Sequence, residues 1–280
     1  MKATPTDTPT LGAPVRAKMS PRRRARLARG TQYAVLLVAV VVVVMVTDWA
    51  RVGTSFFNLA VAKEMLPTLG GALRNTVTYT LGAFAVGLSL GTVLALMKLS
   101  SVRPYRWIAT VYIEFFRGIP ALLVVVSFGF AVPVALGVSI DSLILKAALG
   151  LGMVSAAYIA ETLRAGIQAV PRGQVEAARS LGMSNGRTLL SVVIPQAFRI
   201  VLPPMTNEII LLTKDTSLIY LLGLTRSQFD LTKIGRDALN SAHGGLTALF
   251  VVGAGYLLIT IPLGLLARWL ESRTGKARRS

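Results

Sequence analysis

Residues 171–195 read PRGQVEAARSLGMSNGRTLLSVVIP and form the longest polar interruption in the second half of an apolar chain. Three arginines recur along it: Arg172, Arg179 and Arg187. On both sides it is flanked by apolar segments, at about 143–165 and 200–222, that are long enough to cross a bilayer. The stretch therefore predicts a loop in water between two membrane-spanning helices.

The composition is that of a membrane protein. Of the 280 residues, 53% are hydrophobic and 15% are charged, and the mean hydropathy is +0.62, whereas a soluble domain carries about 25% charged residues. The absence of cysteine excludes disulfides, thiol catalysis and thiolate metal sites, and the single histidine, His243, excludes a multi-histidine metal site. We therefore expect no catalytic residues and no metal site on this chain.

The basic residues that give the net charge of +18 lie mainly before, between and after the apolar segments. Eight of the 30 Lys and Arg lie in residues 2–29, before the first apolar segment, and five lie in residues 268–279. Basic residues gathered at the ends and in alternate connections mark the cytoplasmic side of a membrane protein. This placement indicates a membrane topology and argues against nucleic acid as a partner.

The N-terminal part predicts a basic tail followed by an anchor. Residues 1–30 are rich in Pro, Thr, Ala and Arg without a helical apolar period, so we expect a disordered cytoplasmic tail. Residues 31–50 contain a long apolar run, and Thr-Asp-Trp-Ala-Arg at 47–51 is a poor cleavage site for a signal peptide. An uncleaved transmembrane anchor is therefore the better interpretation of residues 31–50.

The rest of the chain predicts an external connection at 51–68, a transmembrane domain at 69–270 and a basic cytoplasmic tail at 271–280. The spans of that domain are expected at about 69–97, 107–136, 143–165, 200–222 and 246–270. The first contains Gly82, Gly87 and Gly91, small residues that let membrane helices approach closely. The predicted fold class is all-α, a polytopic membrane protein with about six transmembrane helices.

The basic residues also orient this arrangement. The segments expected inside carry 21 Lys and Arg, and the two external connections carry five. The bias has the sign that the positive-inside rule requires, so both termini are expected in the cytoplasm.

Within the central loop, residues 173–181 predict a short amphipathic helix. Val175, Ala178 and Leu181 recur at intervals of three and form one narrow apolar stripe, and Gly182 suits the end of a helix. Two interpretations remain open: the helix lies on lipid headgroups, or it docks in the groove of a partner. The small side chains Ala177 and Ala178 favour docking.

The spacing in this loop resembles the EAA signature of ABC-transporter permeases. That signature has Glu-Ala-Ala, then a glycine four residues later, then nine residues before an apolar-x-apolar-Pro group. The corresponding residues here are Glu176, Ala177, Ala178, Gly182, Val192, Ile194 and Pro195. Val192 and Ile194 replace the more usual Ile and Leu and preserve the apolar chemistry.

The resemblance is to permeases of the polar amino-acid uptake type and covers about residues 70–270. Further matches lie at 117–120 (RGIP), 171–178 (PRGQVEAA), 195–197 (PQA), 203–204 (PP) and 214–218 (KDTSL). The N-terminal anchor is additional to the five-span core of that type.

The resemblance implies that the loop is a cytoplasmic coupling helix, which docks on a separate ATPase subunit that binds ATP and Mg. The residues it implies for coupling are Gly173, Glu176, Ala177, Ala178, Gly182 and Pro195. The chain has no phosphate-binding loop of the form G-x-x-x-x-G-K-[ST], so no cofactor is expected on it. The other implied partners are a second permease copy or a related permease, an extracytoplasmic amino-acid-binding protein and the bilayer of a bacterial inner membrane.

Polar residues inside the predicted span 200–222 form the second candidate site. They are Asn207, Glu208, Lys214, Asp215, Thr216 and Ser217. Seven residues make nearly two helical turns, so Asn207 and Lys214 share a face, as do Glu208 and Asp215. A charge at the bilayer centre costs about 2.5–3.5 kcal/mol on insertion scales. Such residues form either an ion-paired seam between helices or a substrate path that suits a zwitterion, and the resemblance favours the path.

Smaller features carry predictions of their own. Pro203 and Pro204 either kink the span or occupy its first turn. The pairs Glu114–Arg117 and Glu161–Arg164, three residues apart, predict structural ion pairs. In the connection 223–244, Leu231, Ile234 and Ala238 predict an external amphipathic helix, which either contacts a substrate-delivering protein or covers the mouth of the bundle.

A transporter of another class is the main alternative. An ion-gradient-driven secondary amino-acid transporter would use Glu208, Lys214 and Asp215 as its coupling cluster. The sequence does not choose among amino acids, because a path with both signs of charge suits any of them.

Overall fold

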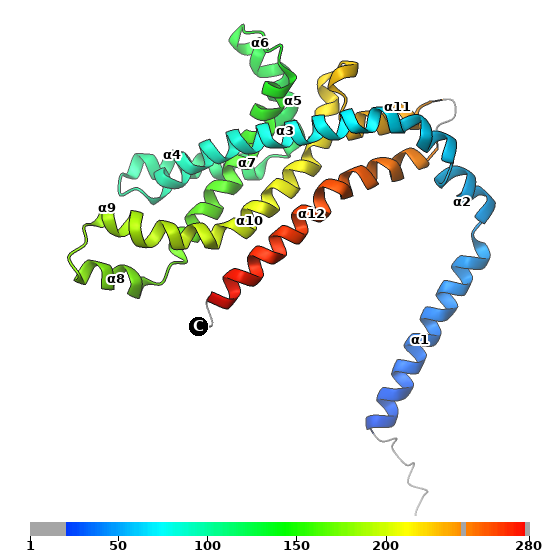
Figure 1. Cartoon of the computed structure of the whole chain (residues 1–280), viewed down its shortest axis with the longest axis horizontal. Coiled ribbons are helices and arrows are strands. Elements are labelled where there is room, and N and C mark those ends of the chain that lie inside the picture. The colour runs from blue at the N-terminus through cyan, green and yellow to red at the C-terminus, as the bar shows by residue number, and fades with distance from the viewer. Residues whose placement is uncertain (1–20, 242–244, 278–280) are drawn as a thin grey trace, which may run out of the picture. The chain divides into compact units, whose positions relative to one another are not determined.

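The computed structural model describes residues 21–241 and 245–277. Every regular element in those residues is a helix, which confirms the all-α prediction (Figure 1). The chain divides into two compact units, residues 1–52 and 53–280. Residues 1–20, most of the predicted disordered tail, and His243 lie outside the described residues.

The first unit is built around α1 (Pro21–Val46). The candidate span within it, Arg26–Val46, has a mean hydropathy of 2.0 and none of it is buried by protein, as expected for an anchor whose neighbour is lipid. The helix begins earlier than predicted, because residues 21–30, expected to be disordered, form its first turns. A run of consecutive good helix formers, several of them arginines, explains the extension.

Length and composition give the described residues five helices able to cross a membrane, or six if one bent pair counts as a span. This agrees with the prediction of about six. The bounds of the shorter elements are α2 Trp49–Phe56, α5 Ala121–Val126, η1 Ser127–Ala131, α6 Val132–Leu136, η3 Thr216–Leu222 and η4 Arg226–Gln228. The helices α3, α4 and α7–α12 are described below with the residues that shape them.

Helix α3 (Leu59–Leu99) is longer than the predicted span at 69–97. The side chain of Asn58 caps its first turn by accepting a hydrogen bond from the Ala60 amide. Residues 59–68, assigned from the sequence to a connection, are helical because they carry a buried stripe, with Val61 and Met65 almost fully covered. Pro67 lies within the helix.

Helix α3 packs along α7 (Leu143–Gln168) through small residues. A Cβ atom on Gly91 would lie 2.9 Å from the carbonyl oxygen of Ala156, and one on Gly152 would lie 2.9 Å from that of Ala83. The two backbones therefore approach as closely as glycine allows, which confirms the prediction of small-residue packing for Gly91.

An ion network joins the ends of these two helices. Glu161 on α7 accepts hydrogen bonds from Lys98 at 2.6 Å and from Arg164 at 2.7 Å, one on each carboxylate oxygen. The predicted Glu161–Arg164 pair is thus confirmed. The additional ion pair between Glu161 and Lys98 of α3 could not be predicted from spacing within one helix, because these two residues are far apart in the sequence.

The predicted span 107–136 is a bent pair of helices. Helix α4 (Arg103–Gly118) ends at the RGIP motif, α5 begins after Pro120, and the two segments meet at 106°. Pro120 has no amide hydrogen to continue the helix, which explains the break. The predicted pair Glu114–Arg117 does not form. The Arg117 guanidinium instead lies 5.6 Å from the centroid of the Tyr158 ring on α7.

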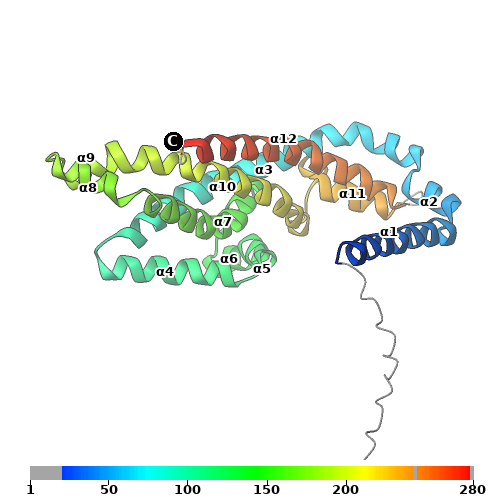
Figure 2. The ribbon, with the colours of Figure 1, turned by 90° about the horizontal axis from the view of Figure 1, so that it is seen from below.

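The polar loop is shorter than predicted. It contains α8 (Arg172–Ser180), and the next long helical segment already begins at Asn185, as α9 (Asn185–Thr188), a π-helical turn η2 (Leu189–Val193) and α10 (Ile194–Asp215). Pro203 and Pro204 lie in the interior of α10, so the prediction that they occupy a first turn is wrong. Figures 1 and 2 show α10 running between α7 and α12 (Thr247–Ala277).

The predicted amphipathic helix in the connection 223–244 is confirmed as α11 (Leu231–Leu239). Leu231 and Ile234 are buried against α3 and α12, and Ala238 packs against the same cluster.

Helix α12 continues to Ala277, through most of the predicted tail 271–280. The N-cap of α7 is Ser142, whose side-chain oxygen accepts a hydrogen bond from the Leu145 amide.

Candidate functional site

Helix α8 has an inner face that fixes it to the bundle. Ala178 is 6% exposed, and Val175 packs against a small apolar cluster. That cluster contains Val170 before α8, Val193 at the end of η2, and Ala197 in the first turn of α10. The inner face of α8 therefore packs against η2 and against the apolar cluster that η2 shares with the first turn of α10.

The outer face of α8 carries the other residues of the motif. Gly173, Glu176 and Ala177 are exposed, and a Cβ atom on Gly173 would meet nothing within 4 Å. Leu181, the third residue of the predicted apolar stripe, is 85% exposed and stays apart from the inner face of α8. It follows the last helical residue, where the chain has already left the helical path.

The turn after α8 is held by backbone geometry. Gly182 has φ of 81°, in the left-handed region that favours glycine. Its amide donates to the Arg179 carbonyl at 3.0 Å, and the Met183 amide donates to the Ala178 carbonyl at 3.1 Å, the two bonds of a Schellman motif. The Arg179 side chain also donates to the Met183 carbonyl. The predicted role of Gly182 as the end of the helix is confirmed.

Five of the six predicted coupling residues thus lie on α8 and its turn, while Pro195 lies in the first turn of α10. The π-helical turn η2 comes directly before Pro195, where the missing amide hydrogen interrupts regular helical bonding. The structure therefore separates an exposed group, Gly173, Glu176 and Ala177, from an inner face formed by the buried Ala178 and by Val175, which packs against the apolar cluster.

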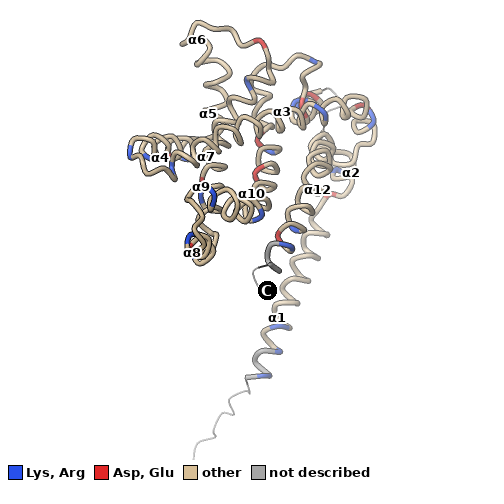
Figure 3. Tube along the Cα trace, turned by 60° about the vertical axis from the view of Figure 1, so that its left-hand side comes forward, with Lys and Arg blue, Asp and Glu red and all other residues tan. Residues whose placement is uncertain are grey.

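Helix α10 carries the second candidate site, and Figure 3 shows acidic and basic positions along it between α7 and α12. Asn207 and Lys214 are both exposed, as expected for residues on one face. Among the residues that the structure describes, no carboxylate lies within 4.0 Å of the Lys214 ammonium. An ion-paired seam through Lys214 is therefore not formed in this structure.

Glu208 is held by a residue that the sequence did not point to. Ser155 on α7 is 2% exposed and donates a hydrogen bond to Oε1 of Glu208 at 2.8 Å. On its other side Ser155 abuts Gly87 of α3, where a Cβ atom would lie 2.9 Å from the serine hydroxyl. The only signal in the sequence for this role was that Ser155 is a polar residue in an apolar helix. That Glu208 is its hydrogen-bond partner depends on the packing of three helices.

The end of α10 divides the remaining predicted path residues. Asp215 and Ser217 are half-buried, whereas Thr216 is fully buried and its hydroxyl donates to the Thr213 carbonyl at 2.7 Å. Thr216 begins η3, where the helix tightens to 3₁₀ geometry. In this structure Thr216 therefore lines no open surface.

Residues 87–276, from the middle of α3 to the last turn of α12, match the family of binding-protein-dependent transport system inner membrane components. The chain belongs to this family. Family membership and the candidate spans make it a multi-pass membrane protein. The resemblance found in the EAA signature is confirmed.

Relatives of known role share most of the length of the chain. The glutamate/aspartate import permease protein GltK of Escherichia coli is 36% identical over 215 residues, which cover 75% of this chain and 94% of GltK. The arginine transport system permease protein ArtQ of Bacillus subtilis is 34% identical over 208 residues, covering 74% and 93%.

Solved structures agree with the fold. A crystal structure of an amino acid ABC transporter with histidines superposes with a TM-score of 0.68 and 32% identity, covering 75% of this chain and 95% of that chain. An inward-facing structure of the MetNI methionine ABC transporter has a TM-score of 0.57 at 21% identity, which supports the fold alone. The family fold therefore extends through the helices that carry both candidate sites.

Proposed function

We propose that this chain is the transmembrane permease subunit of a binding-protein-dependent ABC importer for polar amino acids. The relatives named above, permeases for glutamate and aspartate and for arginine, support this substrate class. They also favour the importer over an ion-gradient-driven secondary transporter. Both termini lie in the cytoplasm, in keeping with the distribution of Lys and Arg.

The two faces of α8 are the observation that carries the proposal. Its exposed face, with Gly173, Glu176 and Ala177, offers small side chains and one acid to the groove of a separate ATPase subunit. Its inner face packs, through Val175, against an apolar cluster that contains Val193 of η2 and Ala197 in the first turn of α10. A displacement of α8 by the ATPase therefore passes by direct packing to the helix that carries Glu208 and Lys214.

The polar face of α10 forms the substrate path in this proposal. Lys214 has no ion-pair partner among the described residues and binds the substrate carboxylate, while Glu208, oriented by Ser155, binds the ammonium. Both charges are needed to compensate a zwitterion that has left water. A second permease copy, or a related permease, supplies the facing wall of the path, and an extracytoplasmic binding protein delivers the amino acid.

The energy source tests the class of transporter. Purified from its native membrane, the importer co-purifies with an ATPase, and its uptake in vesicles is abolished by vanadate and indifferent to uncouplers. Uptake that survives vanadate and collapses with uncouplers would instead establish the secondary transporter.

The path is tested by two variants of α10. Glu208→Gln and Lys214→Met each remove one charge while leaving the length of the side chain nearly unchanged, and each should reduce substrate-stimulated uptake. Unchanged uptake in both variants would remove the path assignment and leave the importer assignment standing.

A further inference from the structure

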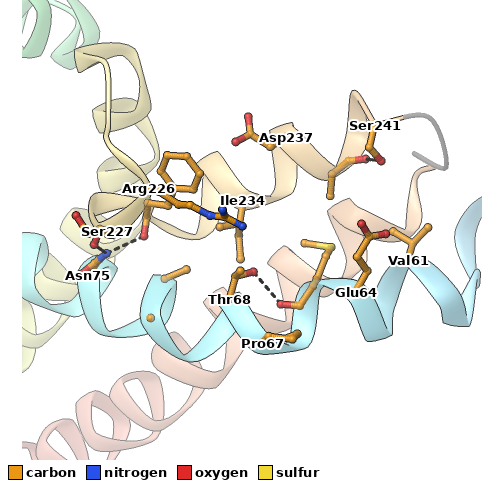
Figure 4. Close-up of a pocket in the computed structure, with 15 residues that line it drawn as sticks. Val61, Glu64, Pro67, Thr68, Asn75, Arg226, Ser227, Ile234, Asp237 and Ser241 are labelled. Atoms are coloured by element: carbon orange, nitrogen blue, oxygen red, sulfur yellow. Dashed lines mark hydrogen bonds between the residues drawn. The ribbon is translucent and has the colours of Figure 1, made fainter.

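A cavity of about 720 Å³ lies at the opposite end of α10 from α8, between the first half of α3 and the segment from η4 to α11 (Figure 4). Its volume falls in the range of small-molecule sites. Charged, polar and apolar side chains all line it. The lining residues include Glu64, Met65, Thr68, Arg226, Ile234 and Asp237.

The wall that carries Arg226 is fixed by side chains of α3. The Asn75 side-chain amide donates to the carbonyls of Ser227 and Phe229, both at 2.9 Å. The Tyr79 hydroxyl donates to the Gln228 carbonyl at 2.8 Å. These three bonds hold the η4 turn against α3, so the backbone that follows Arg226 is fixed before any ligand arrives.

The wall formed by α11 is fixed in the same way. The carboxylate of Asp230 caps the helix by accepting hydrogen bonds from the amides of Thr232 and Lys233. The Leu231 amide donates to the Thr76 hydroxyl of α3 at 3.2 Å. Both walls are therefore joined to α3, which itself forms the third side, and the cavity is a preformed one.

Two opposite charges face this cavity without an ion-pair partner. Asp237 is compensated by Lys233, one turn earlier on α11. Glu64 on α3 and Arg226 on η4 have no oppositely charged group within 4.0 Å in the described residues. Figure 4 shows the Arg226 guanidinium extending over the Thr68 and Ile234 side, and Glu64 further along α3. The cavity thus separates one cation from one anion.

We propose that this cavity is a binding site for a zwitterion with a primary ammonium and an anionic group. Arg226 binds the anionic group and Glu64 binds the ammonium. A ligand with a single charge would compensate only one of the two. The Thr68 hydroxyl donates to the Met65 carbonyl, so its oxygen is available to accept from the ammonium. Met65 and Ile234 provide apolar contact for the rest of the ligand.

Two sources offer this chemistry: a free amino acid or the headgroup of phosphatidylethanolamine. The first source rests on the proposed function, in which it gives the importer an amino-acid site distinct from the path on α10. The second needs only the membrane. The shared recognition is the pair of charges held apart by the cavity.

The test uses the intact chain, purified in detergent, with Glu208→Gln as background so that the path on α10 contributes little binding. Equilibrium binding of radiolabelled L-glutamine probes a zwitterion whose side chain is neutral. N-acetylglutamine and glutamine methyl ester, each lacking one of the two charges, serve as competitors. A second preparation in phosphatidylcholine nanodiscs, with and without phosphatidylethanolamine, tests the lipid source by retention of that lipid.

Arg226→Gln and Glu64→Gln should each weaken binding by about tenfold or more, since each removes a charge-assisted hydrogen bond. Lys63→Gln, which removes an exposed charge next to Glu64 but outside the cavity, should leave binding unchanged. Each single-charge analogue should compete more weakly than glutamine.

The outcomes separate the sources. Glutamine binding lost in both cavity variants identifies the free amino acid, and phosphatidylethanolamine retained by the parent but not by the variants identifies the lipid. Binding of neither ligand, or equal binding by parent and variants, overturns the proposal. ATP-driven uptake by the assembled transporter, measured in parallel, reports the proposed function separately, because uptake can be intact when the cavity binds nothing.

Discussion

At the scale of single residues, Glu208 shows how the bundle orients a charge inside a membrane helix. Its carboxylate takes one hydrogen bond from the buried Ser155 hydroxyl, which leaves Oε2 for a ligand. Ser155 is itself confined by Gly87 of α3, so its position depends on the close approach of α3 and α7. We infer that Ser155 positions Glu208 without contacting the substrate.

Ser155→Ala should therefore raise the KM for uptake by about tenfold, since a hydrogen bond to a charged group contributes about 1.5–3 kcal/mol, while changing the maximal rate little. Uptake in proteoliposomes as a function of substrate concentration measures both. Ser89→Ala is the matched control, because the Ser89 hydroxyl donates only within α3 and is exposed. In a Glu208→Gln background the same substitution should have little further effect. A full effect in that background would contradict a role through Glu208.

Asp230 links the pH dependence of stability to the external helix. Burial raises the pKa of this carboxyl from 3.8 to about 6, because the loss of solvent outweighs the hydrogen bonds from the amides of Lys233 and Thr232. The folded protein binds this proton more tightly than the unfolded chain does. The contribution of Asp230 to the free energy of unfolding is therefore greatest below pH 3.8 and is lost as the pH rises to about 6.

Asp230→Asn should remove this decline, because asparagine caps a helix as well as aspartate does but does not ionise. Thermal unfolding of the purified protein across this pH range measures it, as the difference in Tm between the parent and the variant. Asp230→Ala also loses the cap and should be less stable at every pH, by about 1 kcal/mol. Parallel pH profiles for the parent and Asp230→Asn would contradict the assignment.

The sequence predicts only part of these arrangements. The separation of seven residues was enough to place Asn207 and Lys214 on one face, because this depends on a single helix. In the structure that face is exposed. The bond from Ser155 to Glu208 depends on how α3, α7 and α10 pack together, and the burial of Thr216 depends on how other helices pack around η3. No spacing within one segment reports on such contacts.

At the scale of elements, α8 is a short helix whose position depends on one turn and one apolar cluster. The Schellman motif at Gly182 ends the helix, and the packing of Val175 against the cluster of Val170, Val193 and Ala197 holds it beside η2 and the start of α10. The turn at Gly182 determines the position of the exposed residues of α8. The apolar cluster determines which neighbouring element moves when α8 moves. Both are therefore needed for coupling.

Gly182→Ala should displace α8 and reduce coupling of ATP hydrolysis to uptake. An alanine at φ of 81° is strained by about 1–2 kcal/mol, although its Cβ would meet nothing within 4 Å. Gly186→Ala is the matched control: it also lies in open space, but within α9 and without a positive φ. The ratio of uptake to ATP hydrolysis measures the effect. Equal ratios for the two variants would show that the turn is not needed.

The sequence located most elements but not all of their breaks. The short helix α8 and the external helix α11 follow from apolar spacing. Residues 59–68 contain Lys63, Glu64 and Pro67, which favour a connection by composition, yet their buried stripe continues α3. The bend of 106° at Pro120 was also missed, because hydropathy reports an apolar run and not its direction.

At the scale of the whole molecule, the unit formed by residues 53–280 places two candidate sites in series along one helix. Helix α8 packs against η2 and the apolar cluster at the start of α10, the charged residues lie further along α10, and η3 leads from its end toward α11. A displacement of α8 can thus be transmitted through a few packed side chains to the path residues on α10. The sequence predicted this order of features, because it follows from spacing along the chain.

The central claim is that the exposed face of α8 transmits the work of a separate ATPase, and Glu176→Arg tests it most directly. The transporter, reconstituted with its ATPase and binding protein in proteoliposomes, is assayed for ATP-driven amino-acid uptake. Glu271→Arg, the same charge reversal at an exposed position near the end of α12, is the control. We predict that Glu176→Arg inserts normally and loses uptake by at least about tenfold, while the control transports like the parent. Uptake by Glu176→Arg at the parental rate would contradict the account.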